Sequence, residues 1–318
     1  MAVEVKSEIL NIEPIDLEYT GLKKDSLKGE VAVITGGASN IGLGFARAIA
    51  WAGAKVVVAD INESAGIETQ RVINEENASD SALFVKCDVT QVSEIKNLAN
   101  KAFEKFGKVD LLLNNAMDVS LTGPLLKASL NDLEKSYGLS GRAVLAAIME
   151  FVPKMIERKH GVVVYSSSQF HYSPPMVGGA IYCAGKAIGS SITMSLANEV
   201  KDTGVYVFCV TPGGVVRLDA ARKSHDAEGK VMDKPSRGMP GFNGMIPPEA
   251  GGAAIVYCIL NASRLHGSGI LITEAFDAMK YPYPNPATLT NLKRRKLNDN
   301  ELTRVLMTMG PGFTGFTD

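Results

Sequence analysis

Short apolar runs alternate with longer segments of helical spacing along most of the chain. The apolar runs are nearly continuous in Val, Ile and Leu, which is typical of strands that are covered on both faces by helices. Seven such strands are predicted, at residues 31–34, 55–60, 82–87, 109–113, 161–165, 205–210 and 269–273. The alternation predicts an α/β protein with a doubly wound Rossmann fold, in which a seven-stranded parallel sheet is flanked by helices.

Three segments fall outside this alternation and divide the chain. We predict an N-terminal extension at 1–28, one Rossmann-type domain at 29–278 and a C-terminal arm at 279–318. Within the domain, residues 213–248 are rich in Gly, Pro, Lys and Arg and are expected to form a substrate lid, because a loop of this length in a compact domain is usually functional. In the arm, a short helix is predicted from about residue 299 to 309.

The turn after the first strand carries the clearest ligand signal. Residues 35–44 read Thr-Gly-Gly-Ala-Ser-Asn-Ile-Gly-Leu-Gly, between a predicted buried strand and a predicted helix. Glycines let the backbone turn sharply and approach a ligand closely, and the start of the helix offers free N–H groups and a positive dipole end to an anion. The turn therefore predicts a phosphate site, although tight turns without a ligand also use glycine.

An acidic residue at the end of the second strand extends this signal to a dinucleotide. Asp60 closes the apolar run, 24 residues after Gly36. In a dinucleotide-binding fold a carboxylate at this position hydrogen-bonds the adenosine ribose and repels the 2′-phosphate of NADP. Asn40 is uncharged and stands where an NADP-preferring protein is expected to carry a phosphate-binding arginine. Both features predict a preference for NAD, with an ordinary solvated Asp60 as the alternative.

A tyrosine and a lysine on one helix face offer acid–base chemistry. Tyr182 and Lys186 lie four residues apart in a predicted helix, so their side chains project from the same face. A nearby ammonium favours the phenolate and lowers the pKa of a phenol, which otherwise lies near 10. Ser168 follows the strand at 161–165, at the edge of the sheet where such folds bind ligands. The spacing alone leaves open a Tyr–Lys pair on the surface.

Taken together, these motifs resemble those of the short-chain dehydrogenase/reductase family over about residues 28–275. The matching pieces are residues 35–44, Asp60, Cys87-Asp88-Val89, Asn114-Asn115-Ala116, Ser168, Tyr182 with Lys186, and Pro212-Gly213. The resemblance implies hydride transfer between NAD and a secondary alcohol or ketone. It implies that Tyr182 is the general acid or base, that Lys186 holds the nicotinamide ribose, and that Ser168 binds the reacting oxygen.

The resemblance also implies the remaining residues of the site. Cofactor contacts are expected from Gly36, Ser39, Asn40, Ile41, Gly42, Asp60, Ile61, Asp88, Val89, Asn114, Ala116, Tyr182, Lys186, Pro212, Gly213 and Val215. The substrate pocket is expected to include Met117, Gln169, His171 and Met176. A gap-filling core role for Met117 and a wall or surface position for His171 are the alternatives. No metal site is predicted.

The chain departs from the family pattern at four places. Gly138 replaces the usual Asn of the helix after the fourth strand, and Met117 replaces the usual Gly after Asn114-Asn115-Ala116. The interval between Ser168 and Tyr182 is one residue longer than expected, and Pro212-Gly213 is not followed by the usual Thr. These departures keep two other functions open, namely a redox-inactive NAD-binding scaffold or sensor and a non-redox enzyme with tightly bound NAD.

Composition narrows the setting. A length of 318 residues, 46% hydrophobic residues and a net charge of −1 are those of an ordinary globular protein and predict no nucleic-acid or membrane partner. The N-terminus lacks the apolar core of a signal peptide, and four dispersed cysteines predict buried thiols in a reducing, cytoplasmic setting. The family resemblance implies a homo-oligomer, a tetramer or a dimer, whose C-terminal arm packs on a neighbouring subunit or on its own.

Overall fold

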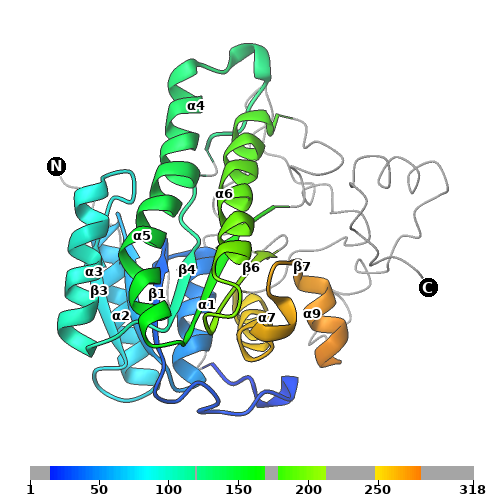
Figure 1. The fold of residues 1–318 in the computed structure, drawn as a ribbon. Coiled ribbons are helices and arrows are strands. Elements are labelled where there is room, and N and C mark those ends of the chain that lie inside the picture. Colours follow the sequence, from blue (N-terminus) through cyan, green and yellow to red (C-terminus); the bar gives the residue numbers. More distant parts are fainter. Residues whose placement is uncertain (1–14, 119, 169–177, 213–247, 281–318) are drawn as a thin grey trace, which may run out of the picture.

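A seven-stranded parallel sheet forms the centre of the molecule (Figure 1). The computed structural model describes residues 15–118, 120–168, 178–212 and 248–280. The strands are β1 (Val31–Thr35), β2 (Lys55–Asp60), β3 (Ala82–Lys86), β4 (Leu111–Asn114), β5 (Gly161–Ser166), β6 (Val205–Thr211) and β7 (Gly269–Leu271), in the spatial order β3-β2-β1-β4-β5-β6-β7. The predicted doubly wound sheet is confirmed, and its order reverses between β1 and β4, where such folds bind ligands.

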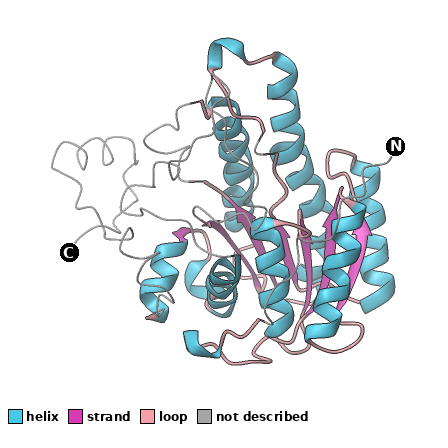
Figure 2. Cartoon of the chain, turned by 180° about the vertical axis from the view of Figure 1, so that it is seen from behind, coloured by secondary structure: helices cyan, strands magenta, loops and turns pink. Residues whose placement is uncertain are grey.

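Helices cover both faces of the sheet (Figure 2). One apolar layer joins the sheet to α1 (Asn40–Trp51), α2 (Glu63–Glu76), α7 (Pro248–Leu260), α8 (Ala262–Leu265) and α9 (Ile272–Met279). The other layer joins it to α3 (Val92–Phe106), α5 (Ala143–Glu157) and α6 (Ala180–Glu199). Three shorter elements precede or connect these, namely η2 (Glu18–Thr20), η3 (Leu125–Lys127) and α4 (Leu130–Tyr137).

The interior strand β1 shows why the strands are continuous apolar runs in the sequence. All five of its residues are buried. Val31 and Val33 belong to the layer on the α3, α5 and α6 side, whereas Ala32 and Ile34 belong to the layer on the α1 and α7 side. Because successive side chains of a strand point to opposite faces, a strand between two helical layers needs apolar residues at every position.

The end of the sheet corrects one sequence prediction. The strand predicted at 269–273 ends at Leu271, and Ile272 begins α9. The Leu271 N–H donates to Glu274 Oε2 at 2.7 Å, which satisfies a free amide at the start of the helix. Ile272, Ala275 and Phe276 are buried, so helical spacing places one apolar face of α9 in the core.

The segment before β1 packs onto the domain. Ile15, Leu17, Leu22 and Leu27 belong to the apolar layer on the α1 and α7 side, and the Leu27 N–H donates to the Ala52 carbonyl at 2.6 Å. Residues 15–28 of the predicted N-terminal extension are therefore part of the folded core. Most of the predicted lid at 213–248, and the arm from residue 281 onwards with its predicted helix, lie outside the described residues.

Candidate functional site

The glycine-rich turn closes tightly over the end of β1. Gly36 has a φ of +63°, and a Cβ atom on it would lie 2.9 Å from the Ala116 Cα. A Cβ on Gly42 would lie 1.9 Å from the Gly36 carbonyl oxygen, so both glycines are required by close backbone contact. Ser39 is exposed, and Asn40 and Ile41 are half-buried. The start of α1 therefore presents its amides at an accessible surface, as a phosphate site requires.

Asn40 adopts the backbone conformation that favours glycine. Its φ is +47°, whereas Ser39 before it is extended. Asparagine tolerates the left-handed region better than most residues, because its short amide can hydrogen-bond locally. The exposed side chain in this part of the turn is that of Ser39 rather than Asn40. Neither residue carries a positive charge for a 2′-phosphate.

Asp60 is tied to the glycine-rich turn. Its Oδ2 accepts from the Ala38 N–H at 3.0 Å, and its Oδ1 accepts from the Asn62 N–H at 3.0 Å. The carboxylate is half-buried at the end of β2, next to the exposed Ile61. Each oxygen has a second lone pair, so hydrogen bonds to ribose hydroxyls remain available.

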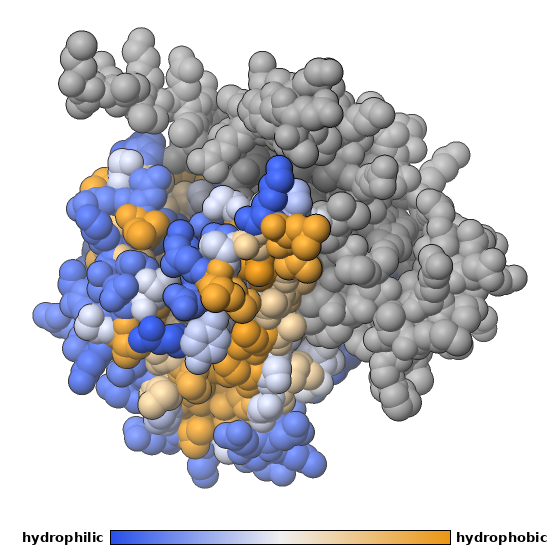
Figure 3. Space-filling model, turned by 90° about the horizontal axis from the view of Figure 1, so that it is seen from above, coloured by the Kyte–Doolittle hydropathy of each residue, from blue (hydrophilic) through white to orange (hydrophobic). Residues whose placement is uncertain are grey.

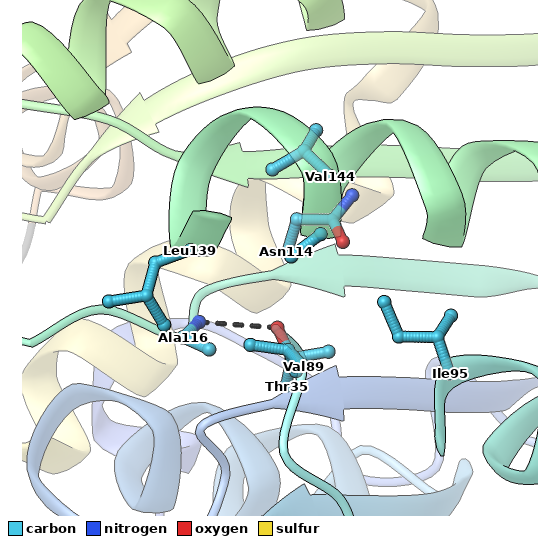
Figure 4. A pocket seen from close by; sticks show the side chains of 8 residues that line it. Thr35, Val89, Ile95, Asn114, Ala116, Leu139 and Val144 are labelled. Atoms are coloured by element: carbon cyan, nitrogen blue, oxygen red, sulfur yellow. Dashed lines mark hydrogen bonds between the residues drawn. The ribbon is translucent and has the colours of Figure 1, made fainter. Parts of the chain in front are cut away.

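The end of β3 supplies the next two predicted residues. Asp88 Oδ1 accepts from the Thr90 N–H at 3.0 Å and from Thr90 Oγ1 at 2.7 Å, which fixes the turn into α3. Val89 is buried and lines a small cavity with Asn114, Leu139 and other residues (Figure 4). The cavity volume is about 10 Å³, the lower limit for a single water molecule.

The exit of β4 gives Asn115, a residue of the matching sequence motif, a role that the sequence did not reveal. Asn115 Nδ2 donates to the carbonyl oxygens of Thr35 and Gly36 at 3.1 and 3.2 Å. Thr35 Oγ1 in turn accepts from the Asn115 and Ala116 N–H groups at 3.0 and 3.2 Å, the second of which Figure 4 draws. Asn115 therefore fastens the glycine-rich turn to β4.

Asn114 lines the same small cavity as Val89 and Ala116, two other residues of the predicted cofactor site. Its side chain is buried in this cavity beside Val144 (Figure 4). Among the described residues, its Nδ2 finds no hydrogen-bond acceptor. A single buried water would satisfy such a donor, since the cavity is polar at this point and just large enough.

Ser168, Tyr182 and Lys186 come together at the carboxyl end of β5. The Tyr182 hydroxyl is hydrogen-bonded to the Ser168 side chain, but burial outweighs this bond and raises the pKa of Tyr182 to about 12. Lys186 is one helical turn further along α6, with its Nζ 5.8 Å from the Tyr182 ring centroid. Burial lowers the pKa of Lys186 to about 7.

The helix beside this triad contains a π-helical segment, η4 (Gly138–Arg142), between α4 and α5. The Ala143 N–H donates to the Gly138 carbonyl, five residues back, and the segment packs against α6. Single π turns inside helices occur frequently at functional sites. Ser140 Oγ contacts Met117 Sδ at 3.4 Å, which turns the Met117 side chain towards this segment.

Five of the predicted site residues fall in segments that the structure does not describe. Gln169, His171, Met176, Gly213 and Val215 lie outside the described residues. Pro212 is described and is buried directly after β6.

A cluster of Glu30, Asp110 and His160 lies at the opposite, amino-terminal edge of the sheet. Its ligand atoms lie within 4.8 Å of one another. Asp110 already pairs with Lys108 and Arg158 and accepts from the Val31 N–H, while His160 Nε2 lies 2.9 Å from Glu30. The cluster is thus an ion-pair network that joins the starts of three strands.

Comparisons with known proteins agree with this geometry. A family model described as short chain dehydrogenase matches residues 30–228. The chain is 32% identical over 216 residues to a short chain aldehyde dehydrogenase 1 from Euphorbia lathyris, covering 67% of this chain and 74% of that protein. It is 28% identical over 194 residues to a human 15-hydroxyprostaglandin dehydrogenase [NAD(+)], covering 59% and 69%.

Two solved structures share the fold. A 3-ketoacyl-(acyl-carrier-protein) reductase from Brucella melitensis complexed with NADH has a TM-score of 0.67 and 26% identity, covering 77% of this chain and 97% of that one. L-sorbose reductase from Gluconobacter frateurii complexed with NADPH and L-sorbose has a TM-score of 0.65 and 23% identity, covering 77% and 95%. Both nicotinamide cofactors therefore occur among the structural neighbours.

Proposed function

We propose that this chain, which belongs to the short-chain dehydrogenase/reductase family, is an NAD-dependent oxidoreductase that interconverts a secondary alcohol and a ketone. Members of the family act on CH–OH groups with a nicotinamide cofactor, which supplies or accepts the hydride when bound. The observation that carries the proposal is the grouping of Ser168, Tyr182 and Lys186 at the carboxyl end of the sheet, the edge at which β1 leads into the glycine-rich turn.

The three side chains divide the acid–base work. Tyr182 donates a proton to the carbonyl oxygen in reduction and removes one from the hydroxyl in oxidation. Ser168, already hydrogen-bonded to Tyr182, positions that oxygen. Lys186 holds the nicotinamide ribose, and its charged form favours the phenolate of Tyr182.

The glycine-rich turn and the strand ends fit a dinucleotide. Gly36, Ser39, Asn40, Ile41 and Gly42 surround the accessible amides of α1 and are the proposed pyrophosphate site. Asp60 and Ile61 are proposed to bind the adenosine ribose, and Asp88 and Val89 the adenine. Ala116 and Asn114, which line one cavity with Val89, and Pro212 directly after β6 are proposed to contact the cofactor further along the sheet edge.

We expect NAD to bind more tightly than NADP, because the Asp60 carboxylate repels a 2′-phosphate and no positive charge at Ser39 or Asn40 offsets it. Titration calorimetry with both cofactors measures the gap. Asp60→Ala should narrow it, with Asp88→Ala as a control that leaves the ratio of the two affinities unchanged. Equal affinities in the wild type would contradict the preference.

Substitution of Tyr182 tests the chemistry. Tyr182→Phe should lower kcat by a factor of about 10² to 10⁴, the usual contribution of a general acid or base, while NADH binding stays near that of the wild type. The substrate class is found by screening secondary alcohols with NAD and ketones with NADH. A Tyr182→Phe enzyme with most of its activity would remove Tyr182 from the mechanism.

Two other functions give different results in the same assays. A redox-inactive scaffold or sensor binds NADH but turns over none of the panel, and Gly138 and Met117 are the observations in its favour. A non-redox enzyme keeps its cofactor tightly bound and releases no free NADH during turnover.

We also propose that the protein is a cytoplasmic homotetramer or dimer. Exposed large apolar residues follow one another along α4 and α5 at helical spacing, namely Leu130, Leu133, Tyr137, Leu145, Met149 and Ile156. Apolar side chains gather in a band on the face seen in Figure 3. Bands of this kind mark association surfaces.

The four cysteines are free thiols, as in a reducing compartment. Among the described residues, none of the helices has the length and apolar character that a bilayer crossing requires.

A further inference from the structure

The Lys186 ammonium is enclosed mainly by neutral groups. Its side chain is 3% exposed, and Nζ donates to the Ser166 carbonyl oxygen at 2.5 Å. Of the groups that face it, Tyr182 belongs to its own helix, Tyr165 to β5, and the buried Cys209 thiol to β6. Within the described part of the chain, no carboxylate forms an ion pair with Lys186. A buried cation in such surroundings needs further stabilisation to keep its charge.

Among the described residues, the Tyr165 ring is the aromatic group nearest to this ammonium. Nζ lies 5.2 Å from its ring centroid, compared with 5.8 Å for Tyr182. Tyr165 is buried and is the register partner of Cys209 on β6 and of Asn114 on β4. The ring is therefore held in the sheet, under the helix that carries Lys186. A cation within about 6 Å of a ring centroid is attracted by the negative charge of the ring face.

The space for the ring comes from a missing side chain on α6. A Cβ atom on Gly189 would lie 2.2 Å from Tyr165 Cζ and 2.4 Å from its hydroxyl oxygen. Gly189 is three residues after Lys186 and thus on the same side of the helix. A large ring on the strand and a glycine on the helix are complementary, and together they set the ring directly below the lysine.

We propose that Tyr165, seated against Gly189, is a positioning residue that holds the Lys186 ammonium in place from the sheet side of the site. The Ser166 carbonyl oxygen accepts one hydrogen bond from Nζ, and the ring face of Tyr165 supplies a further favourable contact for the positive charge. The inference rests on the proposed function, because it assigns Tyr165 a role in keeping Lys186 charged and oriented towards the cofactor and Tyr182.

The test is the pH dependence of NADH binding, followed by fluorescence titration. Affinity should fall as pH rises through the pKa of Lys186, since the charged lysine favours an anionic dinucleotide. Tyr165→Leu should move the midpoint of this fall to lower pH by roughly half to one unit, the size that a desolvated cation–π contact implies. Tyr165→Phe keeps the ring face and should retain the wild-type midpoint.

A paired variant separates positioning from packing. Tyr165→Leu combined with Gly189→Ala refills part of the vacated space, so it should recover thermal stability but keep the shifted midpoint. The double variant carries the test if Tyr165→Leu alone does not fold. Equal midpoints in the wild type, Tyr165→Leu and the double variant would overturn the proposal, and so would an equal shift in Tyr165→Phe.

Failure of the proposed function has a different signature. A wild type that binds neither NADH nor NADPH contradicts the function and leaves the ring contact to be tested by stability. The difference in thermal unfolding between the wild type and Lys186→Met, followed over pH, then reports the pKa of Lys186. If Tyr165→Leu does not lower that pKa, the positioning role is wrong.

Discussion

Burial shifts the pKa values of Tyr182 and Lys186, the two titratable groups of the proposed catalytic site, in opposite directions. It disfavours the charged form in both cases, so it raises the pKa of the Tyr182 phenol to about 12 and lowers the pKa of the Lys186 ammonium to about 7. The site without ligands thus has a neutral tyrosine and a lysine that titrates near physiological pH. Burial of the charged Lys186 side chain in this site lowers the free energy of unfolding.

Lys186→Met should therefore make the protein more stable. The unfolded lysine titrates near 10.5 and the folded one near 7, so between these values the unfolded chain binds one more proton. Stability of the wild type then rises with pH across this window, and the penalty is complete below about pH 7.

Thermal unfolding at several pH values measures this difference. The melting point of Lys186→Met should exceed that of the wild type by several degrees near pH 6 to 7, and the gap should close towards about pH 10. Lys101→Met changes an exposed lysine on α3 and serves as the control. A gap that does not vary with pH would contradict the burial argument.

Asn40 offers a prediction about the glycine-rich turn. Its φ of +47° is costly for residues with a Cβ and without a local hydrogen-bonding group. Asn40→Ala should lower the free energy of unfolding by about 1 kcal/mol, whereas Asn40→Gly should be neutral or slightly stabilising. Urea unfolding of the two variants separates them, and equal losses in both would point to a role of the amide itself.

Among the helices and strands, the π-helical segment η4 is the feature least expected from the sequence. Gly138 starts it, and the nearest atom that a Cβ there would meet is Thr90 Cγ2 at 3.8 Å. The absence of a side chain is therefore not required by packing. Gly66 on α2 is different, because its Cβ would lie 1.9 Å from the Phe84 ring.

These two glycines should respond oppositely to alanine. Gly138→Ala should stabilise the protein by roughly 0.5 to 1 kcal/mol through reduced freedom of the unfolded chain. Gly66→Ala should destabilise it by about 1 to 3 kcal/mol, because the Phe84 ring has to move. Chemical denaturation provides both values. Loss of stability in Gly138→Ala would show that η4 depends on glycine for its backbone.

The sequence predicts the elements better than their ends. Strand interiors such as 31–34 are apolar at every position, and this requirement is visible without a structure. The run 269–273 suits a strand and a helix equally, and the Glu274 bond to Leu271 favours the helix. The π segment depends on one shifted backbone bond, which composition does not reveal. Asn114 and Asn115 are adjacent and chemically identical, but Asn114 is buried in the cavity and Asn115 holds the glycine-rich turn. The difference depends on the backbone path at the end of β4, which the sequence does not reveal.

The exposed apolar side chains along α4 and α5 form a stripe that no other layer of the described fold covers, namely Leu130, Leu133, Tyr137, Leu145, Met149 and Ile156. Met149 is 66% exposed and Leu145 is 48% exposed, on a helix that otherwise packs on the sheet. Exposed apolar side chains in a row, unlike scattered ones, are unusual on a monomer.

A charge on this stripe should disrupt the proposed assembly. Leu145→Glu with Met149→Glu should give a smaller particle by light scattering, because two buried carboxylates would face an apolar interface. Ile67→Glu is the matched control, since Ile67 is 56% exposed on α2 and lies away from the stripe. An unchanged mass in the double variant would place the interface elsewhere.

The hydrogen bond that the Ala38 N–H donates to Asp60 links cofactor preference to the stability of the glycine-rich turn. The same carboxylate that is proposed to reject a 2′-phosphate also holds the glycine-rich turn, and Ala38 is buried. Replacing Asp60 to admit NADP would leave that amide without its acceptor, a loss of about 1 to 3 kcal/mol. A change of cofactor made through Asp60 would therefore also destabilise the glycine-rich turn, unless a second substitution gives the Ala38 amide a new acceptor.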